Sequence, residues 1–204
     1  SLAESLEEKL SLRSQLAGIY EQRLQQEDRA LMEYIRAARL APQNVRVLLN
    51  MEKLATRTES FRELLAVYED VVERIERLEL RVALYLKLAR LYVLHLEDEE
   101  TAEGYFKRAL ELATGQTDIL FSISNIYGEE EEWEELIATY TQLIRHAPAP
   151  IKSRLRREVA RLYRDGLDDP SSAFYELVRV ARYDPSEPGM VDELFELGLG
   201  TDRH

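Results

Sequence analysis

Cysteine is absent from the 204 residues, which excludes disulfides, thiolate metal sites and cysteine nucleophiles. Glycine and proline are scarce, with eight and six copies. Leucine, alanine, glutamate and arginine dominate, a composition that favours helix nearly throughout. No alternating apolar pattern is long enough to predict a strand. No apolar run reaches the length that crosses a bilayer, so we expect no membrane insertion.

Basic residues are outnumbered, because 27 Lys and Arg stand against 39 Asp and Glu, for a formal net charge of −12. Phosphate backbones and anionic lipids repel such a chain, so we expect no nucleic acid as a partner. The opening residues, SLAESLEEKL, lack the basic start and apolar stretch of a signal peptide. No targeting segment is visible, which favours a cytoplasmic location. Because residue 1 is not Met, we expect a piece of a longer protein.

Catalytic and metal-binding patterns are missing as well. The three histidines, His95, His146 and His204, are far apart, and no pair has the spacing of a metal site. The acidic run at 129–132 lacks the alternating oxygen ligands and central glycine of a calcium loop, so we interpret it as a solvated turn. We therefore expect no enzyme activity, no cofactor and no metal.

The sequence repeats itself at a long interval. Residues 160–173, ARLYRDGLDDPSSA, match residues 89–102, ARLYVLHLEDEETA, at seven of fourteen positions. Residues 16–42 carry the same frame 72 residues before the second copy. A different unit lies between these copies, and there residues 45–75 align with 117–147. We call the first kind A-type and the second B-type. The super-period is thus two related halves of about 35 residues each, and such periods indicate a solenoid.

Each half is predicted to form two helices. In the middle A-type copy, apolar residues recur at helical spacing through residues 80–96, and an acidic turn then opens a second helix. The A-type copies carry one extra residue in this turn. The positions Ala89, Tyr92, Ala102, Phe106 and Ala109 resemble the pattern of the tetratricopeptide repeat (TPR), and the alternation of units resembles long bacterial TPR arrays. The resemblance implies an all-α, right-handed superhelix of about five helix pairs plus one terminal helix.

The alignment divides the chain into six units of a single solenoid. Helix pairs are expected at 3–42, 43–76, 77–114, 115–148 and 149–185, and a partial unit at 187–198. Val191, Leu194 and Leu197 of the partial unit are expected to face nothing, or to face the next repeat of a longer array. Self-association through this terminal helix is therefore one expectation.

A stripe of cations is the sharpest functional feature. In TPR folds the first helices line a concave surface, and in residues 151–165 arginines recur at spacings of three and four, within one helical arc. Guanidinium forks bind carboxylates in a bidentate manner, which favours an acidic ligand. The predicted ligand-binding residues of the concave groove are Arg46, Lys53, Arg57, Arg90, Phe121, Asn125, Arg154, Arg157, Arg161 and Arg164. The competing interpretation is a solvated face whose arginines pair with acids such as Glu158 and Asp165.

The sequence thus predicts a non-catalytic scaffold that binds a peptide or protein segment, with acidic segments favoured, in its concave groove. The alternative is a structural module that self-associates, or assembles protein complexes, through exposed solenoid ends. RNA binding by a helical-repeat array is the third interpretation. The net charge disfavours it, and Phe121 is the one aromatic placed for stacking in the predicted groove.

Overall fold

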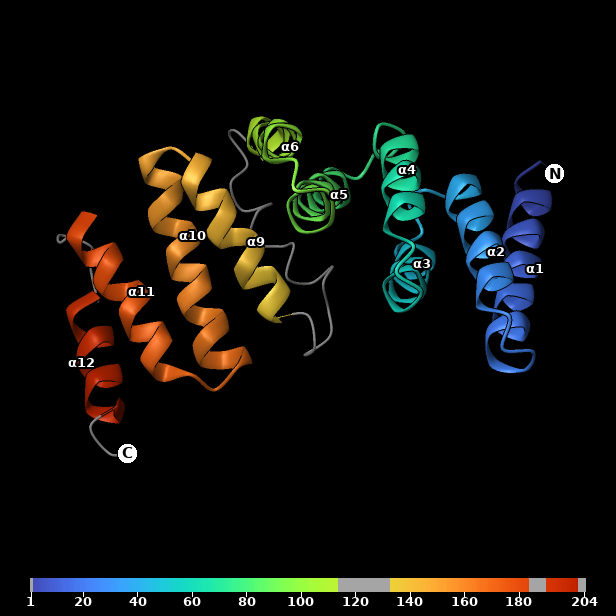
Figure 1. Cartoon of the computed structure of the whole chain (residues 1–204). Helices are drawn as coiled ribbons and strands as arrows, with labels where there is room; N and C mark the ends of the chain where they lie inside the picture. The colour runs from blue at the N-terminus through green and yellow to red at the C-terminus, as the bar shows by residue number, and fades with distance from the viewer. Residues whose placement is uncertain (1, 114–132, 184–189, 202–204) are drawn as a thin grey trace. The chain divides into compact units, whose positions relative to one another are not determined.

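The computed structural model describes residues 2–113, 133–183 and 190–201, and within these ranges all regular structure is helical (Figure 1). The prediction of an all-α fold built from helix pairs is confirmed. The chain divides into two compact units, Ser1–Ala109 and Leu110–His204, and each is described by itself. A single continuous solenoid stays a prediction.

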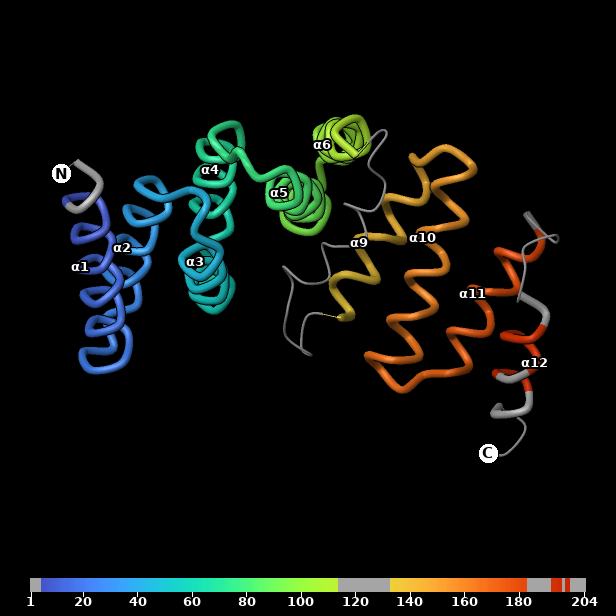
Figure 2. The backbone as a smooth tube through the Cα atoms, turned by 180° about the vertical axis from the view of Figure 1, so that it is seen from behind, coloured from blue at the N-terminus to red at the C-terminus, as the bar shows by residue number. Residues whose placement is uncertain are grey.

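In the first unit, α1 (Leu2–Gln22) pairs with α2 (Glu27–Leu40), and α3 (Val45–Arg57) pairs with α4 (Phe61–Val72). The third pair begins with α5 (Leu78–Leu91), which continues into a π-helical turn, Tyr92–Leu96. Its second helix is α6 (Glu99–Ala113). Packing runs from neighbour to neighbour, since α2 contacts α3 and α4, and α4 contacts α5. Figure 2 follows this path from the other side.

In the second unit, α9 (Trp133–His146) precedes α10 (Ala149–Arg161), and α10 ends in a second π-helical turn, Leu162–Gly166. The last two helices are α11 (Pro170–Tyr183) and α12 (Met190–Thr201). Each helix again contacts the next one along the chain, α9 with α10, α10 with α11, and α11 with α12.

The terminal helix α12 differs from the expectation. Leu197 is buried, and Leu194 packs against the same cluster, which contains Leu177 and Val180 of α11. The prediction that these two leucines face nothing, or face a following repeat, is therefore wrong, because α12 turns this side toward the preceding pair. Phe195, also on α12, is exposed. The side chain of Val191 lies outside the described residues.

The extra residue of the A-type turn is accommodated at the end of the first helix. In each copy a backbone N–H donates to the carbonyl of a tyrosine six residues earlier. The pairs are Gln26 to Tyr20 at 2.9 Å, Asp98 to Tyr92 at 3.2 Å and Asp169 to Tyr163 at 2.8 Å. The shorter B-type turn closes over five residues instead, from the Ser60 N–H to the Ala55 carbonyl at 2.8 Å. The repeated tyrosine therefore marks the point where the wider turn begins.

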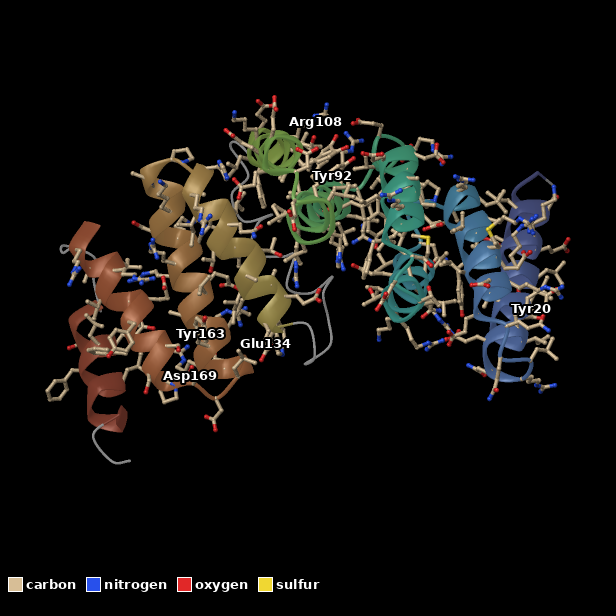
Figure 3. All side chains as sticks on the ribbon, viewed as in Figure 1. Tyr20, Tyr92, Arg108, Glu134, Tyr163 and Asp169 are labelled. Carbon is tan, nitrogen blue, oxygen red and sulfur yellow. The ribbon has the colours of Figure 1, made fainter. Side chains whose placement is uncertain are left out.

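One residue with a left-handed backbone precedes each of these donors. The residues are Gln25, Glu97, Asp168 and, in the B-type turn, Glu59, with φ between 51° and 54°. The aspartates then cap the second helices, since Asp98 accepts from the Thr101 N–H and Asp169 from the Ser172 N–H, both at 3.0 Å. Figure 3 shows Tyr163 and Asp169 together at the turn between α10 and α11. Hydrogen bonds from Thr101, first its backbone N–H and then its hydroxyl, lower the pKa of Asp98, and hydrogen bonds from Ser172, first its hydroxyl and then its backbone N–H, lower the pKa of Asp169.

A polar cluster recurs where the two helices of each A-type unit meet. In the first copy, Glu33 accepts from Arg13 at 2.7 Å and from Arg36 at 2.5 Å. In the third copy the equivalent groups are Glu176, Arg156 and Arg179, at the same two distances. The middle copy replaces the ion pair with stacked Tyr85 and Tyr105, centroids 6.0 Å apart, and Arg108 lies 5.5 Å from the Tyr105 ring. Arg156 thus sits on the packed side of α10 because a largely buried carboxylate meets it.

Candidate functional site

A groove lies between α1 and α3, the first helices of the first two pairs. Its volume is about 550 Å³. Most of its lining is small or carries a neutral polar group. The lining residues are Glu7, Leu10, Ser11, Ser14, Gln15, Gly18, Gln22, Tyr34, Asn44, Arg46, Val47 and Asn50. The groove thus offers mainly hydroxyl and amide groups, which both donate and accept hydrogen bonds.

Gly18 keeps the groove open. A Cβ added to it would meet nothing within 4 Å apart from its own helix and chain neighbours. The equivalent positions, 72 and then 71 residues further on, are Arg90 and Arg161. The first A-type helix therefore lacks a long side chain at the position where the later copies carry one.

Two exposed residues of opposite charge belong to the groove lining, Glu7 on α1 and Arg46 on α3. Tyr34 donates to Glu21 at 3.3 Å. Burial, followed by the charge and hydrogen bond of Glu21, raises the pKa of Tyr34, and Arg46 opposes this shift. Arg57, further along α3, is held by two carboxylates, with Glu21 at 2.9 Å and Glu27 at 2.8 Å. Its charge is thus largely matched locally.

The remaining predicted residues of the first unit lie apart from the groove lining. Lys53 is exposed on α3, and Arg90 is half-buried at the end of α5. A buried ion pair lies on the same two helices, where Lys87 of α5 donates to Glu52 of α3 at 2.6 Å. The lysine side chain is 7% exposed, so this pair belongs to the packing between neighbouring first helices.

Of the predicted arginine stripe, Arg154, Arg157 and Arg161 lie on α10 and Arg164 in the turn that follows it. Arg161 forms a forked contact with Glu158, at 2.5 Å and 3.1 Å. Arg164 lies in the π-helical turn and contacts Asp165 at 2.7 Å and Glu193 of α12 at 3.2 Å. Arg154 is exposed and Arg157 is half-buried. Phe121 and Asn125 lie outside the described residues. A ligand role for this stripe stays a prediction.

The groove between α1 and α3 was not predicted as a site from the residues of α1. Ser11, Gln15, Gly18 and Gln22 recur at spacings of three and four, which is the same signal that identified the arginine stripe. A spacing of uncharged residues is a weaker indication of a ligand site than a spacing of charged ones, because it carries no electrostatic preference for a ligand. Within the described residues, no three His, Asp or Glu side chains gather as a metal site would require. No described helix is long and apolar enough to cross a membrane.

Comparisons with known proteins give structural similarity alone. No family model matches the chain, and no curated protein matches it. Among solved structures, YrrB, "a TPR protein with an unusual peptide-binding site", is 17% identical, with 94% of this chain and 91% of that chain covered and a TM-score of 0.35. The TPR protein TTC0263 of Thermus thermophilus is 19% identical, with 95% and 99% covered and a TM-score of 0.33. A TPR protein of Parabacteroides merdae is 20% identical, with 94% and 72% covered and a TM-score of 0.39.

The repeated motif and the helices that it forms agree with each other. Each described A-type unit has two helices, a small residue and a tyrosine near the end of the first, and a buried alanine early in the second, which are Ala30, Ala102 and Ala173. On these features the chain has a TPR-like repeat fold.

Proposed function

We propose that this protein is a non-catalytic scaffold that binds an extended segment of a partner protein in the groove between α1 and α3. The observation that carries the proposal is the lining of that groove. An extended peptide presents an N–H and a C=O at every residue, and none of these groups is paired within the peptide itself. Gln15, Gln22 and Asn50 supply amide groups that pair with both kinds, whereas the side-chain carbonyl of Asn44 already caps α3 by accepting from the Val47 N–H.

The open space at Gly18 gives the peptide backbone room to approach α1 closely, since no side chain projects there. Recognition of the main chain makes binding tolerant of sequence, so the ligand class is an extended segment rather than one fixed motif. Arg46 adds one positive charge to the lining and favours a ligand with a carboxylate nearby.

A preference for acidic ligands is therefore proposed at Arg46 and not along a continuous stripe. Arg57, Arg161 and Arg164 each have carboxylates within 3.2 Å, and a ligand would have to compete with these partners. Exposed pairs of this kind contribute roughly 0–1 kcal/mol each, so a multivalent acidic ligand displaces them at modest cost. Binding in the groove nonetheless has a smaller free-energy cost than binding along the paired arginines.

The test is a selection of short linear peptides from a random library, followed by fluorescence anisotropy with the selected peptide. We expect Gly18→Arg to weaken binding by about tenfold or more, because it places in the groove the side chain that later copies carry. Arg46→Gln is expected to weaken acidic peptides more than neutral ones. Failure to select any peptide that depends on Gly18 would reject the groove.

The matched control is Gly104→Arg. Gly104 is also a helical glycine with nothing within 4 Å of an added Cβ, but it lies on α6 and outside the groove lining. Both substitutions replace a helical glycine with a better helix former, so both variants should fold. Equal loss of binding in the two variants would mean that the added charge, and not the groove, is responsible.

A further inference from the structure

An apolar stripe on α1 is exposed to solvent. Leu12, Leu16 and Ile19 are spaced by four and three residues, so they lie on one side of the helix. Their exposed fractions are 65%, 38% and 43%. At 3.6 residues per turn this stripe is centred about 100° around α1 from the groove residues, so the two surfaces are distinct.

Two of these three positions are buried in both later A-type copies. Leu84 and Leu88 of α5 stand 72 residues after Leu12 and Leu16, and both are almost inaccessible. In the third copy, the equivalents Leu155 and Val159 of α10 are buried as well. In both copies the second helix of the preceding pair packs against the first helix that carries them, α4 on α5 and α9 on α10. In the later copies, the element that covers this surface of the first helix is thus the second helix of the preceding pair.

The covering helix also brings carboxylates. Glu73, which follows α4, accepts from the Tyr85 hydroxyl at 2.6 Å. Glu69 of α4 accepts from the Tyr92 hydroxyl at 2.6 Å and from the Tyr105 hydroxyl at 2.9 Å. Arg108 lies 3.8 Å from Glu73. An α4-type helix therefore pairs apolar contact with negative charge at the edge of the stripe.

The edge of the α1 stripe has the complementary charge. At the positions of Tyr85 and Arg108, the first copy carries Arg13 and Arg36, and both contact the single buried carboxylate of Glu33. One negative charge thus meets two positive ones. Lys9, Leu12, Arg13, Leu16 and Glu33 surround a shallow hollow of about 240 Å³, enough for one large apolar side chain.

We propose that this face of α1 binds an amphipathic helix with the chemistry of α4: apolar residues at spacings of three and four, followed by a carboxylate. The apolar residues cover Leu12, Leu16 and Ile19, and one of them fills the hollow. A carboxylate in the place of Glu73 pairs with Arg13 and Arg36. The place of Glu69 faces Tyr20 and Glu33, the equivalents of Tyr92 and Tyr105, so a neutral hydrogen-bonding residue suits that position of the bound helix better than a carboxylate.

The test uses a fluorescent peptide of residues 60–76, held helical by a lactam between positions 62 and 66, both exposed in α4. Circular dichroism verifies that the free peptide is helical. Anisotropy then measures its binding to the whole chain and to the Leu12→Glu/Leu16→Glu variant. We expect at least about a tenfold loss in this variant. Leu94→Glu, at a leucine that is 53% exposed but outside the stripe, is the control and should bind like the original chain.

A second arm reverses one charge of the peptide with Glu73→Lys. We expect about threefold or greater weakening, and a smaller difference in high salt, because the partner cations lie at an exposed edge. Absence of binding, or equal binding by the stripe variant, overturns the proposal. Sedimentation velocity distinguishes a second copy as the occupant. Self-association of the original chain that Leu12→Glu/Leu16→Glu abolishes would also overturn it.

Discussion

The recurring polar cluster of the A-type units predicts a strong coupling between Arg156 and Glu176. Their side chains are 19% and 13% exposed and meet at 2.7 Å. At an effective dielectric of about 20 the direct attraction at this distance is about 6 kcal/mol, and much of it is offset by desolvation. Removing one partner from a buried pair typically costs 3–5 kcal/mol, and the residual exposure places this pair at the lower end.

Glu176→Met should therefore reduce the free energy of unfolding by about 3 kcal/mol, because it leaves two guanidinium groups facing each other. Arg156→Met should cost less, about 2 kcal/mol, since Glu176 keeps Arg179 at 2.5 Å. The double variant should also cost about 2 kcal/mol, because two methionines fill the space without a buried charge. The middle copy supports this expectation, since stacked tyrosines occupy the same two positions there.

The assay is denaturant unfolding followed by the fluorescence of Trp133, the single tryptophan, which belongs to the same compact unit. Arg179→Ala serves as a control, because its side chain is 57% exposed and its contribution should be about 0–1 kcal/mol. If the double variant loses the sum of the two single effects, about 5 kcal/mol, then the residues are not coupled and the reasoning is refuted.

Three further effects can be measured independently. Gly104→Ala should stabilise the protein by about 0.5–1 kcal/mol in thermal unfolding, because Gly104 is helical and the added methyl group meets nothing. Asp169→Ala should lower the free energy of unfolding by about 1 kcal/mol, because the helix loses its cap. Since the pKa of Asp169 is lowered in the folded protein, this stabilisation is present above the ordinary Asp pKa near 4 and disappears as the pH falls below it. The pKa of Tyr92 is raised to about 12, first by its hydrogen bond to Glu69 and then by burial. Its contribution to the free energy of unfolding is therefore complete below about pH 10 and is lost between about 10 and 12. Glu69→Gln should lower this pKa in a spectrophotometric titration of tyrosinate.

The fold was predictable because it depends on local features that the sequence states repeatedly. The spacing of apolar residues predicts the helices, and the number of residues between repeated positions gives the length of each turn. The extra residue of the A-type turn appears in the alignment, and the structure places it between the repeated tyrosine and the capping residue. The sequence did not show that the helix widens to a π-helical turn there, because periodicity assumes one helical pitch throughout.

The charge balance of the site was less predictable. A helical arc shows that arginines share a side, and Glu158 and Asp165 are neighbours in the sequence, but other partners come from other helices. Arg57 meets Glu21 and Glu27, which lie 36 and 30 residues earlier, and Arg164 meets Glu193, 29 residues later. Such pairings depend on which helices pack together and on side-chain rotamers, and neither follows from the spacing within one helix. Arg164 also lies in the π-helical turn, so a helical wheel drawn with a constant pitch gives the wrong direction for its side chain.

Paired substitutions show what the repeat preserves. Phe61, at the start of α4, stacks on His95 with ring centroids 3.4 Å apart. In the next copy Trp133 takes the place of Phe61 and Gly166 the place of His95, and a Cβ on that glycine would come within 3.2 Å of the indole. The larger ring thus faces the smaller residue, just as an arginine–glutamate pair stands where two tyrosines stand in the middle copy. Because close-packed junctions tolerate changes that keep the joint volume, the two copies differ at both members of a contact, and neither change is explained by the aligned sequence alone.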